Sequence, residues 1–336
     1  MGQDRTSLVK TKKLKLEEPV SKLGSFFILR YKLEVVSDIK KCEKLWQEFS
    51  PNLTLFDTWE FRNAFYEAYK YKLYFLVLRK NGENLALLPL WYEDKNFYDK
   101  NLKRYTWFGS EWQEENKFFS KKIDYIPILL SAAPTPLYLN AISQEAIEKL
   151  KGRVDLQEDE PKYVLNLKGF KNHEDYLKTL KKNTRRNLRK DRNKILSQNP
   201  EIIIDNFSDI KVLIKLAKKR FSEKGETTDW EDPRVVETFT NVIRFSGKSY
   251  RARMIKVRVN GKDGGVDLIC IFRKTYFALK CGYNVSEFSG IGNFINLFEI
   301  DDAIQLGMEK IDFLQNNYQW KNRYFISVPL YKFEKK

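Results

Sequence analysis

Apolar positions in the first half of the chain alternate between strand-like runs and helical spacing. The run Phe26–Val36 predicts a strand, and apolar residues at 42, 45, 46 and 49 recur at the spacing of a helix. A second helix should follow, and Asn81-Gly82 between two apolar runs is typical of a tight hairpin. Two more strands are predicted, at Arg104–Phe108 and Asp124–Leu130.

The second half begins with an expected long helix. Asn172 and Asp175 resemble a capping box that opens this helix, which should run to about Gln198, before Pro200. From Ile202 onward the predicted order is β-α-α-β-β-β-α-β-β, and an antiparallel meander followed by one crossover is typical of an α+β fold. Because the first half also opens with a strand, two helices and a meander, we expect a duplicated architecture. Each copy should have its own sheet, with a V-shaped opening between central strands.

The boundary between the two copies is expected near residues 150–170. The stretch Lys151–Pro161 is acidic from Asp155 onward and indicates a junction. The first 22 residues are polar and basic and contain no apolar core of a signal peptide. We therefore predict a disordered basic tail at 1–23, an N-terminal domain at 24–160 and a C-terminal domain at 161–336.

Composition adds a basic charge to this picture. The chain has 336 residues, of which 42% are hydrophobic and 15% aromatic, enough for buried cores in two domains. Lys and Arg number 61 against 45 Asp and Glu, a net charge of +16. This balance favours polyanionic partners such as RNA, phosphorylated cofactors or anionic lipid surfaces, although a solvated basic surface would give the same number.

Metal and secretory chemistry are disfavoured by the scarcity of ligands. The chain has three cysteines with no CxxC pair, and its one histidine is His173. Neither a zinc site nor a disulfide-stapled secreted fold is expected, so the thiols should lie in a reducing compartment. No apolar run approaches the roughly 18–20 residues of a membrane span. We expect a cytoplasmic protein without a metal or a transmembrane segment.

Half of the net charge lies in one short stretch. Nine basic residues and one acidic residue, Asp191, lie between 178 and 194, which gives 9 − 1 = +8. Lys181, Arg185, Arg189 and Arg192 fall on one face of the expected helix. Such crowding of like charges indicates an anionic partner, which the sequence leaves open among RNA, a nucleotide and lipid headgroups. A solvated face is the simpler alternative.

A glycine-rich turn follows the strand that ends at Tyr283. The segment Ser289-Gly290-Ile291-Gly292-Asn293 leads from a strand into a helix. Backbone N–H groups at such a junction, together with the helix dipole, bind phosphate groups. The alternative is an ordinary helix-start turn.

Three stretches in this order resemble the FemAB-like and CelD-like acetyltransferase group of the GNAT superfamily. The segment 181–190 is similar to the family's SKxRxxLRR helix, with Lys182 and Arg185 at its Lys and Arg positions. The glycine turn is the second stretch. The third, Asp312–Lys321, is similar to the family's DFLRGDEPYK, with Trp320 in place of Tyr and Asn316 in place of Gly.

The resemblance implies tandem GNAT-like domains and transfer of an acyl group from acyl-CoA, such as acetyl-CoA, to an amine acceptor. It places the coenzyme A pyrophosphate at Ser289–Asn293. Candidate catalytic groups are Lys321, for the oxyanion or a donor phosphate, and Tyr283 and Asp312 as acid or base. Candidate contacts to substrate or nucleic acid are Lys182, Arg185, Arg189 and Trp320.

Two alternatives stay open on the same residues. Glu287 stands where GNAT enzymes carry Arg or Gln before the glycine turn, and a carboxylate beside a pyrophosphate is unfavourable. An aminoacyl-tRNA donor, as in FemX-like aminoacyltransferases, therefore remains an alternative. The other is a catalytically inactive tandem GNAT that binds RNA or anionic membrane through its basic helix.

Overall fold

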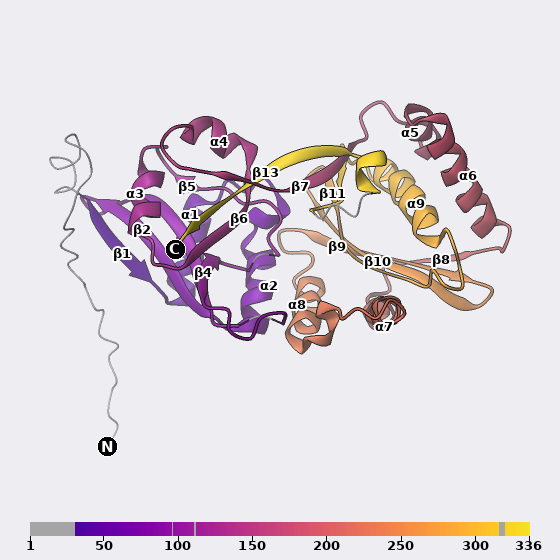
Figure 1. The fold of residues 1–336 in the computed structure, drawn as a ribbon, viewed down its shortest axis with the longest axis horizontal. Helices are drawn as coiled ribbons and strands as arrows, with labels where there is room; N and C mark the ends of the chain where they lie inside the picture. Colours follow the sequence, from indigo (N-terminus) through magenta and orange to yellow (C-terminus); the bar gives the residue numbers. More distant parts are fainter. Residues whose placement is uncertain (1–30, 96, 111, 316–319) are drawn as a thin grey trace, which may run out of the picture.

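The computed structural model describes residues 31–336 except 96, 111 and 316–319. The predicted tail at 1–23 and residue Asn316 lie outside this part. The described chain forms two lobes side by side, with the N-terminal half in one and most of the C-terminal half in the other (Figure 1). None of the described helices is both long and apolar enough to cross a membrane.

The N-terminal lobe forms its first elements for local reasons. Helix α1 (Ile39–Phe49) begins where the side chain of Asp38 accepts a hydrogen bond from Lys41 N, and it buries its apolar face. Strands β2 (Lys72–Lys80) and β3 (Glu83–Glu93) form the expected hairpin. Asn81 and Gly82 at its turn have φ of 50° and 83°, the left-handed conformation that these residue types tolerate.

The remaining elements of this lobe surround the hairpin. They are β1 (Lys32–Val36), the 3-10 helix η2 (Leu55–Asp57), α2 (Trp59–Tyr69), β4 (Arg104–Trp107), β5 (Phe119–Ser120), α3 (Tyr125–Ala132), β6 (Leu137–Ser143), α4 (Gln144–Leu150) and β7 (Gln157–Asn166).

The predicted strand at Asp124–Leu130 is wrong, because this segment forms helix α3. Its buried residues Ile126, Leu129 and Leu130 recur at helical spacing. The run is apolar almost throughout, so periodicity alone could not separate strand from helix. The acidic part of the expected junction also differs, since Gln157 to Pro161 belong to strand β7.

The C-terminal lobe contains the meander and crossover that the sequence predicts. Its elements are α5 (His173–Thr179), α6 (Lys182–Leu196), β8 (Glu201–Ile204), η3 (Phe207–Asp209), α7 (Ile210–Ser222), η4 (Asp229–Glu231), α8 (Pro233–Arg244), β9 (Arg251–Val259), β10 (Lys262–Phe272), β11 (Thr275–Tyr283), α9 (Ile291–Gln305), β12 (Lys310–Asp312), η5 (Lys321–Arg323) and β13 (Ile326–Lys335).

The single long helix expected from Asn172 to Gln198 is instead broken into α5 and α6. Thr179 Oγ1 donates to Tyr176 O, and Leu180 adopts an extended conformation with ψ of 154°. Neither proline nor glycine lies at the break. Leu177 and Leu180 both pack into the core under α9, so tertiary packing overrides the continuous helical pattern.

The expectation of two separate sheets is also wrong. Among the described residues one continuous sheet has the strand order β1-β2-β3-β4-β6-β13-β7-β12-β11-β10-β9-β8. The strand order is the same from either edge of the sheet. From one edge, the antiparallel strands β1 to β4 are followed by β6, which is parallel to β4; from the other, the antiparallel strands β8 to β11 are followed by β12, which is parallel to β11. The last strand of each half-sheet is exchanged: β13 completes the N-terminal one and β7 the C-terminal one. The fold is thus α+β, with a mixed and mostly antiparallel sheet.

An apolar core runs from one lobe into the other. Rings of Phe56 in the N-terminal lobe and Phe277 on β11 meet edge to face at 5.7 Å. Helices α2 and α8 pack together across the junction, where Asn241 Nδ2 donates to Ala64 O. The lobes therefore share buried apolar area in addition to the exchanged strands.

Candidate functional site between the lobes

An opening in the sheet marks the centre of the C-terminal lobe. Residues Thr275–Phe277 of β11 pair in parallel with Lys310–Asp312 of β12. Beyond them β11 continues to Tyr283 and is paired there with β10 only. A bulge places Leu279 as an extra residue opposite β10, so the side chains beyond it change faces. The V-shaped opening predicted from the sequence would lie here, where β11 extends beyond the end of β12.

A buried cluster of charges lies where this opening meets the N-terminal lobe. Lys162 Nζ on β7 bridges Asp312 Oδ2, at 2.8 Å, and Glu115 Oε2. Asp312 is fully buried and also accepts a hydrogen bond from Leu314 N. Burial opposes the charge of Lys162, but the two carboxylates outweigh it and raise its pKa. Asp312 is therefore locked in a structural ion pair.

Lys321 is buried beside the same opening. Its Nζ donates to Phe313 O and to Gln315 O, both at 2.6 Å, so it holds the chain that follows β12. Burial lowers the pKa of its ammonium, against the attraction of Glu114, the Cys281 thiol and Asp312. The structure thus brings Lys321 and Asp312 together, as the motif spacing suggests.

The N-terminal lobe contributes acids that the sequence analysis missed. Glu114 is 9% exposed, and its carboxylate accepts a hydrogen bond from Gln315 N after β12. Burial raises the pKa of Glu114, while Gln315 N–H, Lys321 and Lys280 oppose this rise. The only local signal was an acidic pair, Glu114-Glu115, within an aromatic stretch. Gln315, which donates to Glu114, lies 201 residues away, and Lys162, which pairs with Glu115, lies 47 residues away, so the sequence did not reveal the role of this pair.

Arg62 holds the segment that delivers these acids. This arginine is 3% exposed, and it donates to Phe56 O, Phe108 O and Asn116 Oδ1, each at 2.7 Å. Gly109 lies against its side chain, with a left-handed φ of 96°. The carbonyl and amide acceptors fix both ends of the segment 108–116, and thereby the position of Glu114.

Tyr283 lies on the face of the sheet covered by α9, with its ring against Gly292. Its Oη donates to Asp267 Oδ2 at 2.7 Å. Asp267 lies beside Glu299 of α9, and neither oxygen of Glu299 faces a donor among the described residues. Two adjacent buried carboxyls cannot both ionise, so burial raises both pKa values, that of Asp267 to about 7.

The glycine turn lies at the start of α9 and is closed on two sides. A side chain at Gly290 would lie 2.8 Å from Asp191 Cβ, and one at Gly292 would meet the ring of Tyr283 at 3.1 Å. Asn293 Nδ2 donates to Asp191 Oδ2. A carboxylate of α6 thus lies beside the expected phosphate site at Ser289–Asn293. Glu287 pairs with Lys262, which compensates its charge.

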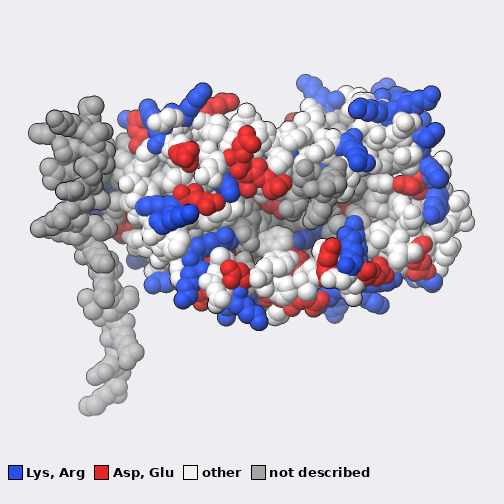
Figure 2. All heavy atoms as spheres, in the orientation of Figure 1, with Lys and Arg blue, Asp and Glu red and all other residues white. Residues whose placement is uncertain are grey.

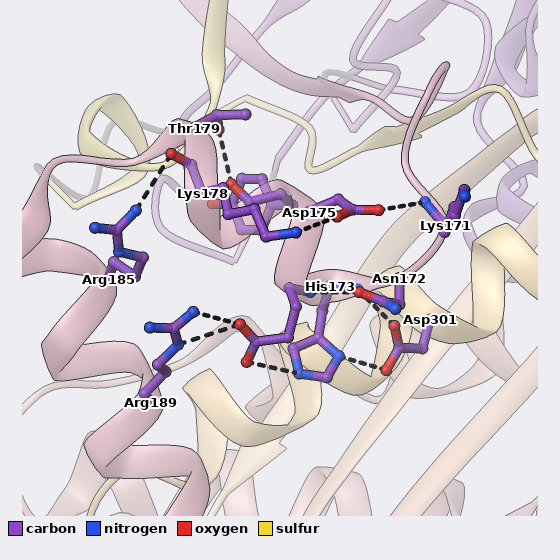
Figure 3. A network of polar contacts seen from close by, with 11 residues as sticks. Lys171, Asn172, His173, Asp175, Lys178, Thr179, Arg185, Arg189 and Asp301 are labelled. Atoms are coloured by element: carbon purple, nitrogen blue, oxygen red, sulfur yellow. Dashed lines mark hydrogen bonds and ion pairs between the residues drawn. The ribbon is translucent and has the colours of Figure 1, made fainter.

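The candidate contacts on the basic helix differ from one another. Arg189 pairs with Glu174, which lies 3.7 Å from His173, and His173 in turn pairs with Asp301 of α9 (Figure 3). Arg185 donates to Lys178 O. Lys182 is exposed, and Trp320 is half-buried against Tyr324 and Phe325.

Most other cations of this stretch have no acidic partner. Within the described residues no carboxylate lies within 4 Å of seven of the nine cations, namely Lys181, Lys182, Arg185, Arg186, Lys190, Arg192 and Lys194. They form a basic rim along the outer end of the C-terminal lobe, over α6 (Figures 1 and 2). Among the described residues no group of three or more His, Cys, Asp or Glu could hold a metal ion.

Several solved structures share the fold of this chain. The structural alignment with FemX covers 90% of this chain and 97% of FemX, with a TM-score of 0.56 and 10% identity. L-PGS from Bacillus licheniformis covers 89% and 92%, with a TM-score of 0.52 and 11% identity. A tandem GNAT protein from the clavulanic acid biosynthesis pathway covers 90% and 98%, with a TM-score of 0.50 and 8% identity. At these identities the likeness shows the fold alone.

Comparison by sequence identifies one segment. No curated protein matches the chain. A family model described as an acetyltransferase (GNAT) domain matches residues 182–322, which hold α6, the glycine turn, the strand opening and Lys321. Residues 182–322 are therefore similar to a GNAT acetyltransferase domain, and the whole chain has a fold similar to that of a tandem GNAT protein.

Proposed function

We propose that this chain is an N-acyltransferase that moves an acyl group from acyl-CoA to an amine. The observation that carries the proposal is the gap between β11 and β12, with the glycine turn at the end of β11 and buried acid and base groups where it meets the other lobe. A thioester in this gap would present its carbonyl to groups from both lobes. The match of residues 182–322 to an acetyltransferase (GNAT) domain supports the donor class.

Glu114 is the proton acceptor in this proposal. The amine attacks the thioester carbon, a C–N bond forms, the C–S bond breaks and coenzyme A leaves as the thiolate. The proton lost by the amine passes to Glu114, whose pKa burial raises above that of an ordinary glutamate. Lys321 would steady the oxyanion, and Tyr283 with its carboxyl partners would protonate the thiolate. Asp312 contributes by holding Lys162.

Release of coenzyme A thiol, measured with acetyl-CoA and a panel of primary amines, tests this function. We expect Glu114→Gln to lower turnover by roughly 100-fold or more, the usual size of a lost general base. The amide oxygen can still accept from Gln315 N, so folding should survive. Thiol release that Glu114→Gln leaves unchanged would remove Glu114 from the mechanism, and no release with any amine would reject the donor class.

The donor site has a test of its own. A pyrophosphate at Ser289–Asn293 would lie close to the carboxylate of Asp191. Asp191→Asn should therefore tighten coenzyme A binding several-fold, because a like charge beside the helix N-terminus disappears. Unchanged or weaker binding would place the donor elsewhere.

Aminoacyl transfer from an RNA-bound donor is the second candidate. The observation that favours it is the unpaired basic rim of α6, which a coenzyme A site alone does not require. Titration with labelled tRNA, coenzyme A and anionic vesicles at two salt concentrations separates this candidate from the first. It also separates both from an inactive protein that binds membranes.

A further inference from the structure

Four cations form a row along the exposed face of α6. They are Lys182, Arg186, Lys190 and Lys194, which recur every four residues and are all exposed. In the described part of the chain, no carboxylate lies within 4 Å of any of them. At a rise of about 1.5 Å per residue, the row covers roughly 18 Å of the helix. It lies within the basic rim at the outer end of the C-terminal lobe (Figures 1 and 2).

The row lies beside the proposed donor site. Asp191, next to Lys190 in the sequence, faces α9, where its carboxylate accepts a hydrogen bond from Asn293 Nδ2 at 2.7 Å. Helix α6 therefore borders the glycine turn, toward which β11 extends beyond the end of β12. A partner docked on the row would lie next to the proposed entrance for the donor.

The donor site is poorly suited to a free nucleotide. Asp191 lies against Gly290, and among the described residues no cation lies within 4 Å of its carboxylate. Coenzyme A would bring a pyrophosphate and a ribose phosphate close to this like charge, which is unfavourable. A phosphopantetheine arm on a protein holds the same thioester through one phosphodiester and has no nucleotide. Fewer negative charges then approach Asp191, and the surface of the protein that carries the arm can supply the affinity.

The chemistry of the row fits an acidic protein helix. Carboxylates placed four residues apart on a helix recur at a rise of about 6 Å, the same as that of these cations. The stretch 178–194 contains no aromatic residue on which a nucleic-acid base could stack. Each contact would be an exposed ion pair, individually weak and sensitive to salt. Such contacts suit a partner that must dock and leave in every reaction cycle.

We infer that the row on α6 docks an acidic acyl carrier protein, which presents the acyl donor as a phosphopantetheine thioester. This inference rests on the proposed function and changes only the molecule that holds the thioester. The amine attacks the thioester carbon, a C–N bond forms and the C–S bond breaks. The carrier protein leaves as the thiolate, as coenzyme A would, and the proton of the amine passes to Glu114.

Binding of a fluorescently labelled holo acyl carrier protein tests the inference without an acyl group or an amine. The triple variant Arg186→Gln, Lys190→Gln and Lys194→Gln should bind it roughly tenfold more weakly or worse, because three exposed ion pairs are lost together. The affinity of the parent protein should also fall as salt is raised.

The matched control replaces Lys40, Lys41 and Lys44 by Gln. These cations are exposed on α1 of the N-terminal lobe, so the control removes the same net charge far from the row (Figure 1). Its affinity should change by less than about twofold, since exposed charges beyond a Debye length are largely screened. With a reactive amine, the parent should use acetylated carrier protein with a kcat/KM roughly tenfold or more above that for acetyl-CoA, because charge steering raises association rates.

No saturable binding of the carrier protein to the parent, equal losses in the two triple variants, or a higher kcat/KM for acetyl-CoA would each overturn the inference. Loss of tRNA or anionic-vesicle binding in the α6 variant, with carrier binding unchanged, would assign the row to RNA or to a membrane instead. Thiol release separates the two proposals. No release from either donor with any amine would reject the proposed function, whereas release from acetyl-CoA without carrier binding would reject the inference alone.

Discussion

Two regions of the C-terminal lobe carry the same residue types in opposite circumstances. At the lobe junction, Lys162 and Lys321 are buried, and each is held by carboxylates or backbone carbonyls. Along α6, Lys182, Arg186 and Lys190 are exposed, with no carboxylate within 4 Å in the described part of the chain. The sequence analysis named both as site residues, Lys321 as a catalytic group and Lys182 as a contact to substrate or nucleic acid. Burial separates them: the junction charges hold the fold, whereas the α6 charges are available to a partner.

The largest effect should come from removing the central junction cation. Lys162→Ala would leave Asp312 and Glu115 buried without their partner, so we expect a loss of about 3–5 kcal/mol in the free energy of unfolding. Denaturant titration measures it. Lys121→Ala, which breaks an exposed pair with Glu83, should lose less than about 1 kcal/mol. Similar losses in the two variants would contradict the contrast between buried and exposed charges.

Lys321→Ala should have a smaller effect on folding and a clear effect on turnover. Its Nζ donates two hydrogen bonds to buried carbonyls, so the expected loss is about 2–3 kcal/mol. Turnover should fall roughly 10- to 1,000-fold if Lys321 steadies the oxyanion. Arg323→Ala, an exposed cation on the same 3-10 helix, is the control and should change neither quantity. A Lys321→Ala variant with parental stability would show that these hydrogen bonds are not structural.

The carboxyl pair behind Tyr283 predicts a dependence of stability on pH. Burial raises the pKa of Asp267 to about 7, whereas an unfolded Asp titrates near 4. Between these values the folded state keeps a proton that the unfolded state has lost, so stability falls as pH rises from 4 to 7. The slope should approach ~1.4 kcal/mol per pH unit for one proton.

Asp267→Asn removes this proton and should flatten the dependence, which thermal unfolding at several pH values can measure. Asp263→Asn, on the same strand but more exposed, should keep the parental slope. A parental slope that is already flat would show that the buried pair does not share a proton.

The smallest effect on folding is expected on α6. Replacing Lys182, Arg186 and Lys190 together by Ala should change stability by no more than about 0.5 kcal/mol, because removing like charges relieves repulsion. If RNA binds this rim, its affinity should fall, and the salt slope should shrink by roughly 0.7–0.9 for each lost phosphate contact. Lys178 and Arg189, already paired with acids, should matter less. Unchanged binding of tRNA, coenzyme A, anionic vesicles and the acyl carrier protein would identify the rim as a solvated face.

Turn residues, helix capping and strand spacing predicted the elements that depend on neighbouring residues in the sequence. The Asn81-Gly82 hairpin, the helix start at Asn172 and the β9–β10–β11 meander follow from turn residues, capping and spacing, and these predictions are confirmed. The glycine turn and the pairing of β12 with β11 also lie where the motif order suggested. The sequence could separate neither strand from helix at α3, nor one helix from two at α5 and α6, since packing decides both.

The part of the site that was missed depends on contacts between distant segments. Glu114 accepts a hydrogen bond from Gln315 N, and Glu115 pairs with Lys162 Nζ. Arg62 of α2 is buried and donates to the carbonyls of Phe56 and Phe108, which belong to other segments. No spacing rule connects such residues. The roles proposed for Lys321, Tyr283 and the glycine turn remain predictions.

The exchange of β7 and β13 has a consequence for how the molecule is made. In the N-terminal half-sheet, β6 pairs with β13 at the inner edge. The ribosome synthesises β13 after every other strand of the sheet. Until β13 emerges, β6 presents an unpaired edge, the kind of surface that invites association with other chains. The N-terminal lobe, although translated first, therefore reaches its final sheet only when the C-terminal lobe does.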